Sequence, residues 1–165
     1  MKHLTTSAIA LSFAVLGFAN GAQAQEAKKL FFEGDIVTHA LAGQQGPFCL
    51  LKNQYKRGEA VAFRIRVMMP DGKVADANAL KSVQVELGNG TKLPARYGGH
   101  GMPPTDFFWS LFWTVPDDFP TGSLGYKVVA TMQDGSTQEW KPFNRDSTLL
   151  TVIAGTPTMA APRPQ

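Results

Sequence analysis

The stretch "GEAVAFRIRVMMPDG", from Gly58 to Gly72, is the most regular part of the sequence and decides its fold class. Its larger apolar side chains occupy every second position, at Val61, Phe63, Ile65, Val67 and Met69. Because successive side chains of a β-strand point to opposite faces, this period of two indicates a strand with one buried face. Pro70-Asp71-Gly72 then supplies the turn that ends the strand.

Similar alternating or apolar segments recur along the chain, separated by Asp-Gly, Asn-Gly and Pro-Thr-Gly turns. The only candidate for helix is a single turn within residues 75–81. Short strands separated by frequent turns indicate an all-β protein, an antiparallel β-sandwich with a single domain. The further strands are expected within residues 30–41, 83–87, 92–97, 107–115, 124–132, 138–143 and 148–153.

Two longer segments resemble bacterial immunoglobulin-like (fibronectin type III-like) modules. They are "YKRGEAVAFRIRVMMPDGKVADA", residues 55–77, and "FFWSLFWTVPDDFPTGSLGYKVVATMQDG", residues 107–135. The resemblance implies an immunoglobulin-like antiparallel β-sandwich over residues 34–153. It says little about function, because such folds carry many different activities.

The first residues are typical of a secretory signal peptide. A basic start is followed by an apolar run over residues 7–19 and by small residues before a cleavage site near Ala24. We therefore expect the mature protein to be periplasmic or secreted, with no later membrane span. The expected organisation is a signal peptide (1–24), an N-terminal lead-in (25–33), the β-sandwich (34–153) and a disordered C-terminal tail (154–165).

The charge of the chain argues against nucleic acid as a partner. The formal net charge is +3, and the basic residues do not cluster. A periplasmic protein or a small ligand is the partner that we expect.

Four side chains are candidate metal ligands: His39, Cys49, His100 and Met102. Imidazole and thiolate suit copper, zinc or haem iron, and a thioether suits copper best. His39 and Cys49 flank a Gly-rich loop, and His100 is expected on a second loop spanning residues 96–104. Loops gather at the ends of a sandwich, so a copper or haem site could form there. The blue-copper pattern does not apply, because Cys49 precedes His100 by about fifty residues.

Two other interpretations of these residues stay open. In the first, Cys49 is a buried small hydrophobe between Phe48 and Leu50, and both histidines are ordinary surface residues. In the second, Cys49 is a nucleophile and His100 its base, as in thiol-dependent enzymes. The sequence contains none of the common hydrolase, metalloprotease or phosphate-binding motifs. A non-enzymatic binding or accessory protein is therefore the favoured function, with a metal or haem protein and a thiol enzyme as alternatives.

The aromatic segment from Phe107 to Trp113 places apolar side chains on both faces of its expected strand. Trp109 and Leu111 fall on one face, whereas Phe108 and Phe112 fall on the other. The second face is either covered by other parts of the chain or exposed as a ligand or partner surface. If it is exposed, Tyr97 is the residue expected to join Phe108 and Phe112 there.

Overall fold

A computed structural model describes residues 29–40, 49–143 and 150–155, which contain strands and turns but no helix. The expected signal peptide and residues 156–165 of the expected tail lie outside this described part. No helix within it is long and apolar enough to cross a membrane. The strands are β1 (Phe31–His39), β2 (Gln54–Lys56), β3 (Ala60–Met68), β4 (Leu80–Leu87), β5 (Lys92–Pro94), β6 (Arg96–His100), β7 (Asp106–Thr114), β8 (Gly122–Leu124), β9 (Tyr126–Met132), β10 (Thr137–Trp140) and β11 (Leu150–Ile153).

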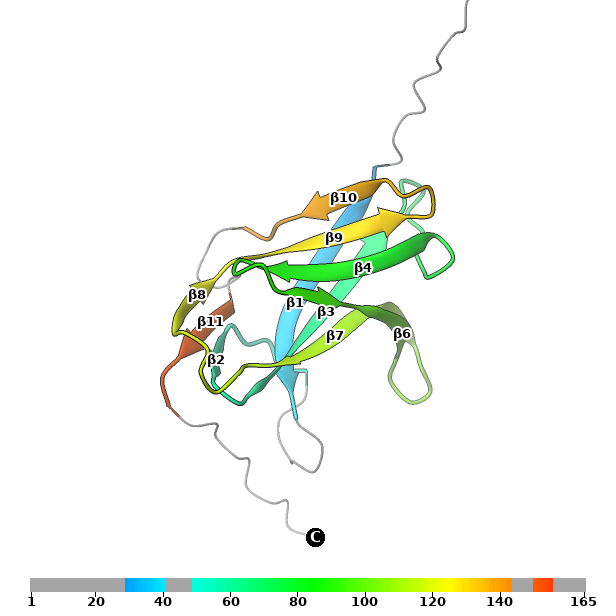
Figure 1. The fold of residues 1–165 in the computed structure, drawn as a ribbon. Coiled ribbons are helices and arrows are strands. Elements are labelled where there is room, and N and C mark those ends of the chain that lie inside the picture. Colours follow the sequence, from blue (N-terminus) through cyan, green and yellow to red (C-terminus); the bar gives the residue numbers. More distant parts are fainter. Residues whose placement is uncertain (1–28, 41–48, 144–149, 156–165) are drawn as a thin grey trace, which may run out of the picture.

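The strands form three sheets (Figure 1). Two have four strands, in the orders β1-β3-β7-β6 and β10-β9-β4-β5, and the third has the order β2-β11-β8. Neighbouring strands are antiparallel, except that β11 runs parallel to β2. The all-β class expected from the sequence is therefore confirmed for the described residues.

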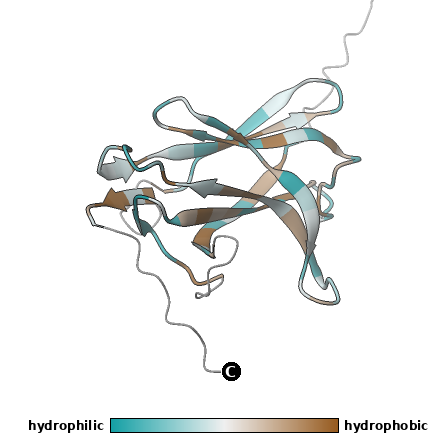
Figure 2. Ribbon diagram, turned by 60° about the horizontal axis from the view of Figure 1, so that its bottom comes forward, coloured by the Kyte–Doolittle hydropathy of each residue, from teal (hydrophilic) through white to brown (hydrophobic). Residues whose placement is uncertain are grey.

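Strand β3 is the strand predicted from the alternating segment, and it lies at the centre of its sheet. Val61, Phe63 and Ile65 are almost completely buried, whereas Arg64 and Arg66 of the other face are half-buried. Figure 2 shows hydrophobic stretches along the strands and hydrophilic residues in several connecting turns. The two faces of β3 therefore have different roles, one in the core and one toward solvent.

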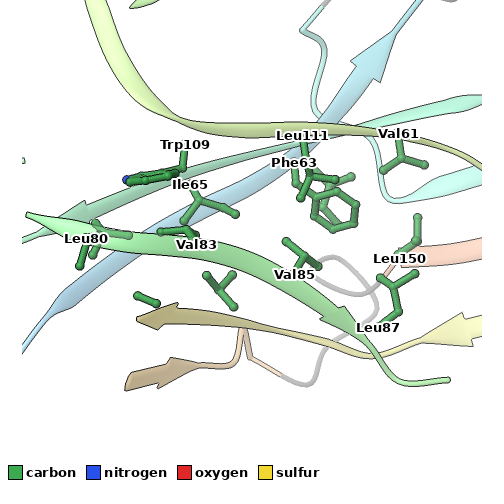
Figure 3. Close-up of a cluster of buried hydrophobic side chains, with 14 of the residues drawn as sticks. Val61, Phe63, Ile65, Leu80, Val83, Val85, Leu87, Trp109, Leu111 and Leu150 are labelled. Atoms are coloured by element: carbon green, nitrogen blue, oxygen red, sulfur yellow. The ribbon is translucent and has the colours of Figure 1, made fainter. Parts of the chain in front are cut away.

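The core lies between the two four-stranded sheets (Figure 3). Phe63 and Ile65 of β3, together with Trp109 of β7, point toward Val83 and Val85 of β4. The indole Nε1 of Trp109 donates a buried hydrogen bond of 2.9 Å to the carbonyl oxygen of Ala75. This bond satisfies the one polar atom that the Trp109 side chain brings into the core.

The segment from Arg96 to His100 was predicted as a loop, and this prediction was wrong. It forms the edge strand β6, and the predicted strand over 92–97 is divided at Ala95 between two sheets. Glycine was interpreted as a loop signal, but Gly99 is needed here for packing. A Cβ atom at Gly99 would lie 2.6 Å from the Cβ atom of Pro104 and 3.0 Å from the Phe107 ring.

The single turn expected within residues 75–81 is present. The amides of Ala79 and Leu80 donate to the carbonyl oxygen of Asp76 (3.1 and 2.9 Å), and the Asp76 carboxylate accepts hydrogen bonds from the amides of Asn78 and Ala79. Strand β1 lies within the strand expected over residues 30–41, and it begins inside the segment expected as the N-terminal lead-in (25–33).

Candidate functional site

A pocket of about 370 Å³ opens on the solvent-facing side of the β1-β3-β7-β6 sheet. Its floor comes from positions that alternate with the core residues, as the pairing of Val37 with Ala62 and of Ala62 with Phe112 shows. The pocket is lined by Val37, Thr38, His39, Cys49, Ala62, Arg64, Gly98, Gly99, His100, Phe108, Ser110 and Phe112.

Cys49 lies at one rim of this pocket in an unusual backbone conformation. Its φ angle is 58°, in the left-handed region that residues other than glycine rarely adopt. Three hydrogen bonds to Thr38 hold this part of the chain. The Cys49 amide donates to the Thr38 carbonyl (3.0 Å), the Thr38 amide donates to the Leu50 carbonyl (2.8 Å), and the Leu50 amide donates to Thr38 Oγ1 (3.1 Å). Such locally strained conformations occur preferentially at functional sites.

The Cys49 thiol and the His100 imidazole are in contact. Sγ of Cys49 lies 3.7 Å from Nε2 of His100, although the two residues are 51 positions apart in the sequence. This contact joins opposite edges of one sheet. Leu51 pairs with Val37 on the edge of β1 that does not face β3, whereas His100 belongs to β6 at the far edge. Two groups that the strand order separates thus meet at the rim of one pocket.

His100 is positioned by the hairpin between β6 and β7. It lies opposite Asp106 in the register of the two strands, and its carbonyl accepts a hydrogen bond of 3.0 Å from the amide of Thr105. Its ring lies 5.5 Å from the ring of Phe108, at an interplanar angle of 40°. The backbone pairing and this aromatic neighbour orient the imidazole toward the pocket rim.

His39 lines the same pocket from the last position of β1. Its ring stacks on Phe112 with the ring centroids 3.9 Å apart. Burial lowers the pKa of His39 below 6.5, because the protonated form loses hydration there. The neutral imidazole, which is the metal-binding form, is therefore favoured at neutral pH.

The structure brings together only some of the predicted site residues. Cys49, His39, His100, Phe108 and Phe112 all line the pocket. Met102 is fully exposed in the turn after β6 and is not part of the lining. Tyr97 packs against the core instead, with its ring 5.5 Å from the ring of Trp109.

The interpretation of Cys49 as a buried small hydrophobe was wrong. Cys49 is exposed, and so are Leu50 and Leu51, which are 57% and 76% exposed. The apolar neighbours of Cys49 in the sequence suggested burial. Residues 49–51 instead lie beside β1 at the edge of the sheet, where one side of the segment contacts β1 and the other faces solvent.

Arg64 is a pocket residue that the sequence did not single out. It lies with Arg66 on the polar face of β3 and lines the pocket. Its guanidinium forms a bidentate salt bridge with Asp35, from Nε to Oδ1 (2.8 Å) and from Nη2 to Oδ2 (2.5 Å). The Asp35 hydrogen bond is the main cause of the raised pKa of Arg64, and the charge of Cys49 contributes too. The period-two pattern does place Arg64 on the same face as Ala62, which the pairing confirms as pocket floor.

A charged groove continues from this pocket along the same face of the sheet. It shares Arg64 and Phe108 with the pocket. Arg66 lies here and contacts Asp106 at 2.6 Å and Glu33 at 3.5 Å. The acidic groups of the groove are therefore paired with arginines.

Within the described residues, no three His, Cys, Asp or Glu side chains are grouped closely enough to hold a metal ion together. The Cys49–His100 pair thus offers two protein ligands, and His39 is engaged with Phe112. Two ligands beside a pocket leave the remaining coordination positions of an ion open.

The chain matches no family model, no curated protein and no solved structure. The chemistry of the pocket is therefore the basis for assigning a function.

Proposed function

We propose that this protein is an exported immunoglobulin-like β-sandwich that binds a thiophilic transition-metal ion between Cys49 and His100. The observation that carries the proposal is the 3.7 Å separation of Sγ and Nε2 at the rim of an open pocket. Thiolate and imidazole are the donors that copper and zinc prefer. The signal-like first residues and the lack of common catalytic motifs support a binding protein that acts outside the cytoplasm.

The donor spacing fits chelation without rearrangement. With metal–sulfur and metal–nitrogen bonds of about 2.3 and 2.0–2.1 Å, donors 3.7 Å apart subtend about 115° at the metal. That angle lies between the tetrahedral and trigonal values. The thiol proton would leave to solvent as the ion binds, because the thiolate is the ligand.

The same geometry is less suited to haem. Two axial ligands stand on opposite faces of the porphyrin, whereas Cys49 and His100 approach each other directly with no space for a ring between them. A Soret band in the purified protein, or after addition of haemin, would contradict the metal-ion proposal.

The test is metal titration of the mature protein under reducing conditions. We expect about one equivalent of ion to bind tightly, with loss of binding in Cys49→Ser and in His100→Ala. Met102→Leu is the matched control, because Met102 lies outside the pocket and should leave the affinity unchanged. Retention of the ion by both site variants, or no binding by the native protein, would reject the proposal.

A thiol-dependent enzyme is the alternative that uses the same contact. It predicts turnover of a substrate by the metal-free protein and inhibition by the added ion. The metal-binding proposal expects no such turnover, so this result would overturn it.

A further inference from the structure

We propose that the ion selected by this pocket is copper(I) rather than zinc, and that by bonding to both Cys49 and His100 it links two opposite edges of the sheet. This inference rests on the metal-binding function proposed above. Three features of the pocket carry it: the number of ligands, the pairing of the nearby carboxylates with arginines and the position of the Cys49–His100 pair in the sheet.

The number of protein ligands favours copper(I). Structural zinc sites are almost always four-coordinate with protein ligands, and catalytic sites provide three. The described residues provide two donors in contact, and no group of three. Copper(I) is a soft ion that prefers thiolate sulfur and is commonly three-coordinate, which fits the angle of about 115° with one further ligand from solution.

The nearby carboxylates are engaged in ion pairs. Asp35 is paired with Arg64, and Asp106 and Glu33 are paired with Arg66. The hard oxygen ligands that would help to hold zinc are thus engaged at arginines. Phe112 stacks on His39 and Phe108 lies beside His100, so aromatic rings form part of the remaining lining.

The position of the pair gives the ion a structural effect. Cys49 belongs to the segment that flanks β1, and His100 ends β6 at the opposite edge of the sheet. An ion bonded to both side chains links these edges across the pocket. We therefore expect copper(I) to slow backbone opening in both segments, since an exchange-competent opening must first break a metal–ligand bond.

The experiment compares the two ions on the whole mature protein without oxygen. Copper(I) is supplied as its bicinchoninate complex, and zinc is measured in competition with a chromophoric chelator. We expect copper(I) to bind more tightly than zinc by at least about 100-fold, with one equivalent per chain. Cys49→Ser and His100→Asn should each weaken copper(I) binding by more than about tenfold, whereas Met102→Leu should not. Circular dichroism and urea unfolding verify that each variant is folded.

Hydrogen–deuterium exchange supplies the second readout. Copper(I) should slow exchange at residues 50–52 and 96–100 in the native protein, and not in Cys49→Ser. Zinc binding as tight as copper(I) binding would overturn the inference and leave the metal-binding function standing. Failure of both ions to bind would overturn both proposals. Tight copper(I) binding without slower exchange at either edge would overturn the proposed link between the two edges of the sheet.

Discussion

At the scale of single residues, Cys49 combines an unfavourable backbone with a well-defined side-chain contact. A residue other than glycine in the left-handed region costs about 1–2 kcal/mol. The Thr38 hydrogen bonds hold Cys49 there, and the thiol meets His100 as a result. The protein thus tolerates local strain at the position where the proposed ligand is needed.

This strain predicts the order of stability of two variants that both lack the thiol. Cys49→Gly should be more stable than Cys49→Ala by about 1 kcal/mol, because glycine adopts a φ of 58° without a steric penalty. Urea unfolding of both variants in the absence of metal measures the difference. An alanine variant that is as stable as the glycine variant would show that position 49 is not strained.

At the scale of elements, strand β6 depends on one of its two glycines. Gly99→Ala should destabilise the protein and weaken metal binding, because the new Cβ atom would overlap Pro104 and crowd Phe107 beside His100. Gly98→Ala is the matched control, since a Cβ atom there meets no atom within 4 Å. Urea unfolding and copper(I) affinity check the pair. Equal behaviour of the two variants would contradict the packing role of Gly99.

The sheet that contains β4 carries a cross-strand charge cluster with a predictable pH dependence. Glu86 lies opposite Lys127 of β9 and Lys92 of β5. The hydrogen bond from Lys127, and then the one from Lys92, lowers the pKa of Glu86 below its ordinary value of 4.5. A carboxylate with a lowered folded-state pKa stabilises the fold above the unfolded value and loses this effect as the pH falls through the folded value.

Glu86→Gln should therefore reduce the free energy of unfolding at pH 7, and the difference from the native protein should disappear under acid conditions below pH 4.5. Urea unfolding across this pH range measures it. Glu33→Gln is the control, because Glu33 is exposed and lies 3.5 Å from Arg66, so its effect should be smaller. A pH-independent loss in Glu86→Gln would contradict the charge interpretation.

Local patterns in the sequence predicted the strands that alternate in hydrophobicity, and the structure confirms β3 and the two-faced β7. They also placed Phe108 and Phe112 on the face away from the core, where both now line the pocket. Strand β6 was missed because Gly98 and Gly99 carry no side chain from which a period of two can be read.

At the scale of the whole molecule, the contact between Cys49 and His100 is the feature of the site that the sequence could not predict. It depends on where the segment beside β1 and the end of β6 lie in space, and no local pattern in the sequence reports that placement. The sequence named both residues as candidate ligands from their chemistry alone. Only the tertiary structure shows that they meet, and that Met102 and Tyr97 do not join them.

A ligand that bonds to both edges of the sheet should stabilise the folded chain as a whole. Binding to the folded state alone adds RT ln(1 + [L]/Kd), which is about 2.7 kcal/mol when the free ion is at 100 times its Kd. The midpoint of urea unfolding should therefore rise with copper(I) in the native protein. His100→Asn should show a smaller rise, because it binds copper(I) more weakly.

X-ray absorption at the copper edge identifies the ligands of the ion directly, on mature protein loaded with one equivalent of copper(I). We expect a first coordination shell with one sulfur at about 2.2–2.3 Å and at least one nitrogen at about 2.0 Å, with the sulfur lost in Cys49→Ser. A first shell without sulfur, or one that is unchanged in Cys49→Ser, would contradict a metal site at the Cys49–His100 pair.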